Sequence, residues 1–383
     1  MWKRETDVIK VLSIIGTRPE AIKMAPVIRA LGSQSDIESV VCSTGQHREM
    51  LNQIVSFFSI KPDFDLNLMQ PRQHLCDIAG KVLIRMGKLL DEVGPDWVLV
   101  QGDTVSASFA GLASFYHQIR IGHVEAGLRT RDKYEPFPEE INRRLLGVVA
   151  DLHFAPTEKA RSCLLEEGVD PKTVIVTGNT AIDSLIRTQE KQGDDPPVIP
   201  SAILQAMAGR KMILVTGHRR ENLGGRLRDI CRALAETVER NKDVCVVYPV
   251  HLNPEVQRTV NEVLCGQDRI VLSEPLPYPQ FVWLMSHAHI LLSDSGGIQE
   301  EAPALNKPIL ITRNNTERPE GVESGCAKLV GTDMRQIVSE IELLLEDSSA
   351  YEKMASSPNP YGDGTAALKV VDALRHFKDF HER

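Results

Sequence analysis

The sequence predicts an α/β protein made of two Rossmann-like units. Short apolar runs rich in valine, isoleucine and leucine alternate with longer helical patterns along the chain. This alternation is typical of parallel sheets that are covered by helices on both faces. The chain has 383 residues, which is too long for one hydrophobic core and fits two domains of ordinary size.

The first predicted unit begins with a strand at residues 8–16 and a helix at 19–31. A strand at 37–44 and a helix at 50–58 follow, and the strand at 96–103 leads into a helix of small residues at 104–117. Further strands are predicted at 119–126, 151–157 and 173–180. We expect this unit to span residues 1–188.

The strand–helix alternation stops at residues 189–208, where three prolines, a glycine and four charged residues indicate a linker. Strands are predicted again at 211–218, 243–251, 269–276, 287–297, 307–314 and 327–333. We expect a second unit at residues 189–363. The last helical pattern lies within 364–383 and is expected to cross back onto the first unit.

Composition excludes several classes of partner. The chain is 42% apolar and 25% charged, as soluble globular proteins are. Its net charge of −8 argues against a general attraction to nucleic acid or to an anionic membrane. An anionic ligand would therefore have to be held by local arginines and backbone dipoles. No apolar run approaches the length that spans a bilayer.

The cysteines and the N-terminus indicate a reducing compartment. The seven cysteines are scattered and form no C-x-x-C pair, which predicts free thiols in a cytoplasmic protein. The first residues lack the long apolar stretch of a signal peptide and read as a polar leader into a strand.

Polar and small residues gather where the predicted strands end. These segments are "GTRPEAIK", "QGDT", "HVEAGLRT", "TGHRREN", "YPVHLNP" and "SDSGGIQEE". Ligands of open parallel sheets bind outside the carboxyl ends of the strands. With two such units, we expect these loops to face each other across a cleft that binds the substrate.

Residues 293–301 predict a diphosphate site. Gly296 and Gly297 would let a ligand approach the backbone, and the helix that starts there offers free N–H groups. Glu301 lies one turn further and is placed to hold ribose hydroxyls. The alternative is a glycine turn that only packs a helix on a strand; the strand-end position and the acids favour phosphate binding.

Cations follow other strand ends. Arg18 and Lys23 flank a helix start and are candidates for an anion clamp, although Pro19 in the first turn is also ordinary helix chemistry. His218 and Arg219 follow a second strand, with Arg220 beside them, and "NTERPEG" offers Arg318. An exposed basic turn is the alternative for this second group.

Acids occur at two predicted strand ends and at one predicted helix start. Asp103 directly follows a buried strand, where a helix N-cap is as good an interpretation as a catalytic acid. Glu125 lies at a similar strand end. Glu139 and Glu140 follow Pro138, where acids are common because of the helix dipole. For the charged residues between them a solvated loop is the best interpretation: Arg129, Arg131, Asp132, Lys133 and Glu135.

Metal and redox cofactors are not expected. His287 and His289 lie near a predicted strand with no acid or cysteine at ligand spacing, and we interpret them as one inward and one outward side chain of that strand. No dinucleotide-binding glycine fingerprint, phosphate-binding P-loop or nucleophile elbow occurs in the sequence.

The strand-end motifs, in their order along the chain, resemble those of the bacterial non-hydrolysing UDP-N-acetylglucosamine 2-epimerases. The resemblance extends from about residue 8 to residue 375 and also includes "QHREML", "PEEINR", "TGNTAIDSL", "LVGTD" and "NPYGDG". It implies the GT-B architecture and an isomerase that interconverts UDP-N-acetylglucosamine and UDP-N-acetylmannosamine. It also implies elimination of UDP and its re-addition, a role in cell-envelope polysaccharide biosynthesis, and no cofactor.

The resemblance also implies roles for individual residues. Asp103, Glu125 and Glu139 would be the catalytic acids, with base and acid unassigned among them, and His218 would meet the diphosphate. The residues implied to bind the nucleotide sugar are Arg18, Lys23, Phe281, Ser295, Gly296, Gly297, Glu301 and Arg318, with Phe281 near the uracil. A homodimer is implied, and so is a second UDP-N-acetylglucosamine bound as an allosteric activator at Gln46, Arg72, Glu139, Arg219 and His251.

Three rival functions share parts of this pattern. A hydrolysing 2-epimerase would release N-acetylmannosamine and UDP, but its first loop usually resembles "GSRAE" rather than "GTRPEA". A UDP-sugar glycosyltransferase shares the fold, but three acids at matching motif positions argue against it. The same acids argue against an inactive sugar-nucleotide sensor.

Overall fold

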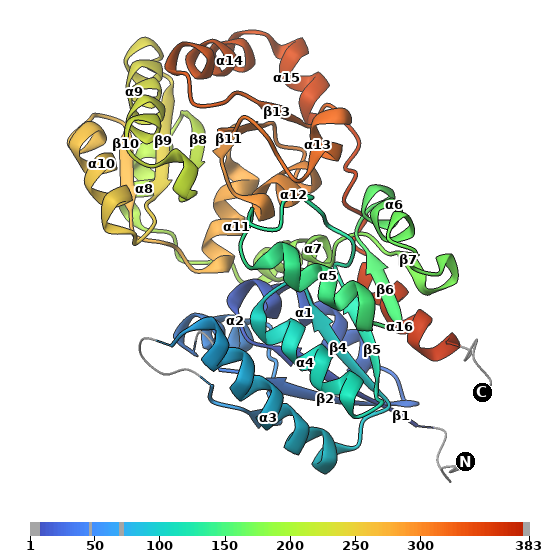
Figure 1. The fold of residues 1–383 in the computed structure, drawn as a ribbon. Coiled ribbons are helices and arrows are strands. Elements are labelled where there is room, and N and C mark those ends of the chain that lie inside the picture. Colours follow the sequence, from blue (N-terminus) through green and yellow to red (C-terminus); the bar gives the residue numbers. More distant parts are fainter. Residues whose placement is uncertain (1–7, 46–47, 69–72, 378–383) are drawn as a thin grey trace. The chain divides into compact units, whose positions relative to one another are not determined.

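The computed structural model describes residues 8–45, 48–68 and 73–377. The chain divides into two compact units, which are coloured along the sequence in Figure 1. Unit 1 comprises Met1–Ser184 and Tyr361–Arg383, and unit 2 comprises Leu185–Pro360. The domain limits that we expect from the sequence, at residues 188 and 363, stay predictions.

Unit 1 contains one parallel sheet with the strand order β3-β2-β1-β4-β5-β6-β7 among its described residues. The strands are β1 (Ile9–Ile15), β2 (Ile37–Ser43), β3 (Phe64–Asp65), β4 (Trp97–Gln101), β5 (Arg120–Val124), β6 (Leu152–Ala155) and β7 (Val174–Val176). The order changes direction between β1 and β4. This is the switch point at which ligands of doubly wound sheets bind.

The helices of unit 1 connect these strands. They are α1 (Arg18–Gly32), α2 (Arg48–Phe57), α3 (Leu75–Val93), α4 (Val105–Tyr116), α5 (Glu139–Val149), α6 (Glu158–Glu166), the start of α7 (Thr180–Asp194) and α16 (Ala366–His376). Helices α3, α4 and α5 pack side by side, whereas α16 packs against α1 (Figure 1). The carboxylate of Asp183 accepts hydrogen bonds from the first N–H groups of α16, at 3.3 Å from Ala366 and 2.8 Å from Ala367.

Unit 2 repeats the same plan. Its parallel sheet has the order β10-β9-β8-β11-β12-β13 among the residues described there, so its switch point lies between β8 and β11. The strands are β8 (Lys211–Thr216), β9 (Val244–Pro249), β10 (Ile270–Ser273), β11 (Ile290–Ser293), β12 (Ile309–Ile311) and β13 (Ala327–Leu329). The helices are α8 (Ser201–Met207), α9 (Gly225–Arg240), α10 (Pro254–Leu264), α11 (Tyr278–His287), α12 (Gly296–Ala304), α13 (Pro319–Glu323), α14 (Met334–Glu346) and α15 (Ser348–Ala355).

The sequence determines these elements through burial and capping. Every residue of β4 is buried, as expected for a strand covered on both faces. Helix α1 starts with a capping box, in which Thr17 accepts from the N–H of Glu20 and Glu20 accepts from the N–H of Thr17. The predicted fold class, two parallel-sheet α/β units, is confirmed. Across the described part of the chain, no helix is long and apolar enough to cross a membrane.

Two histidines lie in the core of the first sheet. His123 on β5 and His153 on β6 are partners in the strand register, and their side chains are buried. Burial lowers the pKa of His123 to about 3 and that of His153 to about 4, from an ordinary value of 6.5. Both rings are therefore neutral in the folded protein near neutral pH, while the unfolded chain would protonate them below pH 6.5.

We predict that His153 makes the protein less stable as the pH falls from 6.5 towards 4, because only the unfolded chain then binds the proton. Replacing it by asparagine should reduce the slope of the unfolding free energy against pH by up to about 1.4 kcal/mol per pH unit in that window. Urea unfolding at several pH values measures this slope. Equal slopes for the variant and the wild type would contradict the prediction.

Candidate functional site

Several of the candidate residues lie at the switch points of the two sheets. In unit 1, Arg18 opens α1 directly after β1, and Asp103 follows β4. In unit 2, His218 follows β8 and Ser295 follows β11. Each unit thus presents polar side chains at the edge where its strand order reverses, as open parallel sheets do when they bind a ligand.

Asp103 does not cap a helix. Thr104 is the N-cap of α4, and its side chain accepts the N–H of Ala107 at 3.0 Å. The Asp103 carboxylate instead accepts a hydrogen bond from Nε of Arg143 at 2.7 Å, and Nδ2 of Asn142 donates to the Asp103 backbone carbonyl at 2.8 Å. The N-cap interpretation is therefore wrong, and the carboxylate is directed by α5.

Glu125 occupies a strained position directly after β5. Its φ of 65° lies in the left-handed region, which a residue with a Cβ adopts at an energetic cost. Its buried carboxylate lies 2.5 Å from the Lys23 ammonium and accepts hydrogen bonds from the side-chain amides of Gln101 and Asn179. Lys23, predicted to contact substrate, thus contacts Glu125 in this structure.

Glu139 begins α5, where the helix dipole favours a negative charge. Its Oε2 atom is buried and has no hydrogen-bond partner among the described residues. A buried polar atom without a partner is costly and calls for an explanation such as a missing ligand or a catalytic role. Of the three predicted catalytic acids, Glu139 is thus the one with a buried carboxylate oxygen that is left unpaired in the described structure.

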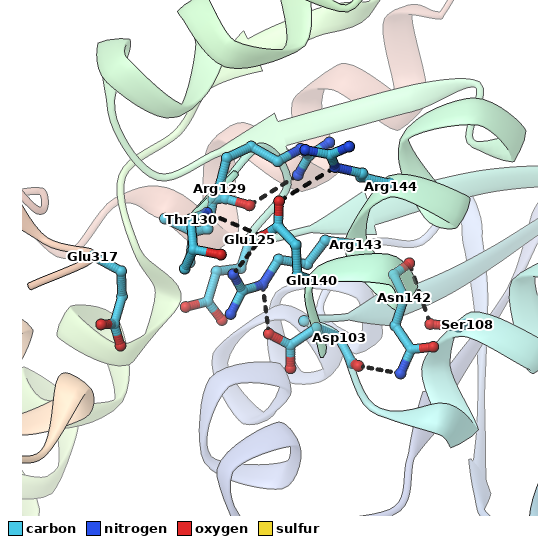
Figure 2. A network of polar contacts seen from close by, with 12 residues as sticks. Asp103, Ser108, Glu125, Arg129, Thr130, Glu140, Asn142, Arg143, Arg144 and Glu317 are labelled. Carbon is cyan, nitrogen blue, oxygen red and sulfur yellow. Dashed lines mark hydrogen bonds and ion pairs between the residues drawn. The ribbon is translucent and has the colours of Figure 1, made fainter. Parts of the chain in front are cut away.

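Glu140 and Arg143 were not among the predicted site residues. The Glu140 carboxylate is completely buried and accepts hydrogen bonds from the backbone N–H groups of Thr130 and Arg131 and from Arg143 and Arg144 (Figure 2). The spacing of these side chains on α5, three and four residues apart, is a sequence signal for a shared helix face. The signal does not show which loop that face holds.

The segment between Glu125 and Glu139 is not simply solvated. The side chain of Arg129 is 2% exposed and makes two hydrogen bonds of 2.8 Å to the Glu167 carboxylate. Its interpretation as a solvated residue is wrong, because a partner 38 positions away along the chain covers it. Arg131 pairs with Glu166 at 2.6 Å, but both of these side chains are exposed.

In unit 2, Asp294 organises the loop that follows β8. Its fully buried carboxylate accepts the backbone N–H groups of His218 and Arg219 and, at 3.0 Å, the side-chain amide of Asn222. Its Oδ1 atom also lies 3.5 Å from Nδ1 of His218. The His218 ring stacks on His251 with 5.4 Å between the ring centroids. His218 and His251, which were predicted for different roles, are thus neighbours in this structure.

The glycine turn after β11 forms a helix start, as predicted. Ser295 is the N-cap of α12, and Gly296 and Gly297 form its first turn. The first N–H groups of a helix have no partner within it and favour a bound anion. Glu301, predicted to hold ribose, accepts a hydrogen bond from the Tyr278 hydroxyl at 3.1 Å.

Arg318 and Arg219 share an acid that was not predicted. Glu317 lies 2.8 Å from Arg318, 3.0 Å from Arg219 and 2.6 Å from Arg313. Burial acts to raise the pKa of Glu317, but these three guanidinium groups outweigh it and hold the pKa well below its usual range. Arg318 also pairs with Glu300 at 2.6 Å. The arginines are thus held in place by carboxylates, and an anion would have to share them.

Phe281 is half-buried on α11, and Gln46 and Arg72 lie outside the described residues. The activator role of Gln46, Arg72, Glu139, Arg219 and His251 stays a prediction. His287 ends α11 rather than lying in a strand, so that interpretation is wrong. Over residues 8–45, 48–68 and 73–377, no group of three or more His, Cys, Asp or Glu side chains is arranged to hold a metal ion.

Comparisons with known protein families and with known sequences agree with each other. Residues 29–375 match the family model described as UDP-N-acetylglucosamine 2-epimerase. A UDP-N-acetylglucosamine 2-epimerase of Salmonella typhimurium is 50% identical over 379 residues, which cover 97% of this chain and 99% of the relative.

Solved structures agree with the sequences. The UDP-GlcNAc 2-epimerase of Neisseria meningitidis, bound to UDP-GlcNAc, aligns with a TM-score of 0.88 at 46% identity, over 96% of this chain and 99% of that one. The enzyme of Methanocaldococcus jannaschii, in complex with UDP-GlcNAc and UDP, aligns with a TM-score of 0.80 at 32% identity, over 96% of this chain and 100% of that one. These neighbours have the GT-B fold, and this chain shares that fold class.

Two adjacent glycines of α12 test how tightly Arg318 is held. A Cβ on Gly296 would lie 2.5 Å from Nη1 of Arg318, whereas a Cβ on Gly297 would meet nothing within 4 Å among the described residues. We predict that Gly296→Ala displaces the guanidinium from Glu300 and Glu317 and costs about 1–3 kcal/mol of unfolding free energy.

Gly297→Ala is the matched control and should be neutral or stabilise the helix by up to about 1 kcal/mol. Urea unfolding of the two variants measures the difference. Equal unfolding free energies would mean that Arg318 moves aside without cost.

Proposed function

This chain belongs to the UDP-N-acetylglucosamine 2-epimerase family, and from that premise we propose that it interconverts UDP-N-acetylglucosamine and UDP-N-acetylmannosamine without net hydrolysis. The observation that supports this most strongly is the set of acids in unit 1 that follow β4 and β5 and begin α5. Asp103 and Glu125 are held by fixed cationic partners, and Glu139 has a buried carboxylate oxygen without a partner in the described structure.

The chemistry of carbon 2 explains why such acids are needed. Its proton is not adjacent to a carbonyl group, so direct removal is very slow. In an elimination, a base takes this proton, its electron pair forms the C1=C2 bond, and the C1–O bond breaks with its electrons leaving on UDP. The product is 2-acetamidoglucal. Re-addition of UDP to carbon 1, with protonation of carbon 2 on the opposite face, gives the epimer.

We assign the proton transfers to Asp103, Glu125 and Glu139, with base and acid unassigned among them. Lys23, at 2.5 Å from Glu125, offsets the charge of that carboxylate. Glu139 is the one of the three with a buried carboxylate oxygen that has no partner in the described structure. The left-handed backbone of Glu125 supports a functional reason for its position.

We assign the retention of UDP to cations and helix N–H groups. His218 would meet the diphosphate, with its backbone N–H already fixed on Asp294. The remaining proposed UDP contacts are Arg18, Ser295, Gly296, Gly297, Glu301, Arg318 and, near the uracil, Phe281. Fixed donors of this kind stabilise charge as it develops on the leaving diphosphate.

A hydrolysing epimerase and a UDP-sugar glycosyltransferase remain the alternatives. The "GTRPEA" segment favours the non-hydrolysing branch. Relatives with this fold carry out several chemistries, so fold alone does not decide among them.

Incubation with UDP-N-acetylglucosamine in deuterated water, followed by NMR of carbon 2, tests the reaction. We predict the manno epimer with deuterium at carbon 2 and little free UDP. Equimolar UDP and free sugar would indicate hydrolysis, and no turnover without an acceptor would indicate a transferase.

In the same assay, Asp103→Asn and Glu139→Gln should lower turnover by at least about 100-fold while UDP affinity changes little. Glu135→Gln, a carboxylate of the exposed loop, is the matched control and should retain activity. Normal turnover of either acid variant would contradict its assigned role.

We also propose a homodimer with a second UDP-N-acetylglucosamine as activator. Helices α3, α4 and α5 pack together and expose large apolar side chains: Ile84, Phe115, Tyr116 and Val148. Sedimentation velocity should show a dimer that Val148→Asp weakens and Leu343→Asp, on α14, does not. A monomeric wild type would contradict the homodimer.

If a second UDP-N-acetylglucosamine acts as activator, initial rates should depend sigmoidally on substrate concentration. A hyperbolic dependence of initial rate on substrate concentration would contradict the activator.

A further inference from the structure

We propose that Arg143 is a positioning residue that aims the Asp103 carboxylate, and that Glu140 in turn holds Arg143. The proposal rests on the proposed function, which gives Asp103 a part in proton transfer. Figure 2 shows the guanidinium of Arg143 between the two carboxylates. Its Nε donates to Asp103 at 2.7 Å, and its Nη1 donates to Glu140 at 3.4 Å.

The backbone around Asp103 is already fixed. Nε2 of His123 lies 2.8 Å from the carbonyl oxygen of Gly102, and Nδ2 of Asn142 donates to the carbonyl of Asp103 itself at 2.8 Å. Because a carbonyl only accepts, His123 must carry its proton on Nε2. Gly102 has a φ of 71°, which suits glycine and lets the chain turn there. Rotation of the Asp103 side chain is therefore the main freedom left, and Arg143 restricts it.

Glu140, which contacts Arg143, is itself held in place by other hydrogen-bond donors. Its carboxylate is 0% exposed and accepts the N–H of Thr130 at 3.0 Å, the N–H of Arg131 at 3.2 Å and Nε of Arg144 at 3.2 Å. These three donors would remain if Arg143 were replaced. The fold of the segment after β5 should therefore survive that replacement, which separates a positioning role from a structural one.

Arginine suits this position better than lysine. The guanidinium is planar and presents Nε and Nη1 in a fixed fork, so it can contact two carboxylates in a set direction. The Arg143 side chain is 8% exposed, and the Asp103 side chain is 26% exposed. Arg143 is thus shielded from solvent while the carboxylate that it directs remains accessible.

The test compares Arg143→Lys and Arg143→Met with Arg144→Met. Arg144 shares Glu140 but has no contact with Asp103 in the described structure, so it is the matched control. A side chain misplaced by about 1 Å can cost about 100-fold in rate, so Arg143→Met should lower kcat by about that factor. Arg143→Lys should recover part of it, and Arg144→Met should stay within about threefold of the wild type.

Substrate KM, UDP affinity by calorimetry and the melting temperature are measured for each variant. We expect KM and UDP affinity of the Arg143 variants to change by less than about threefold, because the lost interaction acts on the reacting geometry. The proposal is overturned if kcat of both Arg143 variants stays near the wild-type value. It is also overturned if kcat falls only together with UDP affinity and stability. Should Arg143→Met fail to fold, Arg143→Lys alone decides between these outcomes.

Asp103→Asn, assayed in parallel, separates the two proposals. An active wild type, an inactive Asp103→Asn and normal kcat for both Arg143 variants would remove only the positioning role. A wild type without epimerisation, or a fully active Asp103→Asn, would remove the proposed function of Asp103 itself.

Discussion

The buried carboxylate of Glu140 is the interaction on which the acid cluster of unit 1 depends. It joins the segment after β5 to the start of α5 through two backbone N–H groups, and it contacts two arginines of the same helix. A carboxylate with no exposed surface is stable only when donors of this kind satisfy it. The hydrogen bonds that Glu140 accepts fix the path of the chain between Glu125 and Glu139. They also hold α5 so that Arg143 contacts Asp103.

Two of the candidate acids have a fixed cation, and the third does not. Lys23 holds Glu125 and Arg143 holds Asp103, whereas Glu139 keeps a buried oxygen without a partner in the described chain. Unit 2 follows the same principle, because Asp294 fixes the backbone beside His218 and Glu317 is shared by three arginines. Groups that are held before the ligand arrives need little reorganisation during the reaction.

The fold class and the location of the candidate residues could be predicted because they depend on local patterns. Buried parallel strands are continuous apolar runs, and ligands bind outside their carboxyl ends, so Asp103, Glu125 and His218 could be found from the sequence. Glu140 and Arg129 could not, since their partners are chosen by the path of a loop and, for Arg129, by Glu167 on another helix. Glu317 was missed although Arg313 and Arg318 lie within four residues of it, because Arg219, which only the fold brings to it, is 98 positions away.

The central claim is that the C1–O bond of the sugar nucleotide breaks and re-forms while UDP stays bound. Positional isotope exchange measures this directly, with substrate that carries oxygen-18 in the bridge between carbon 1 and the β-phosphorus. The account predicts that the label moves into the non-bridging β-phosphate positions during epimerisation, because the released phosphate can rotate before it attacks carbon 1 again. Complete epimerisation with the label still in the bridge would contradict the account, since carbon 2 would then invert without loss of UDP.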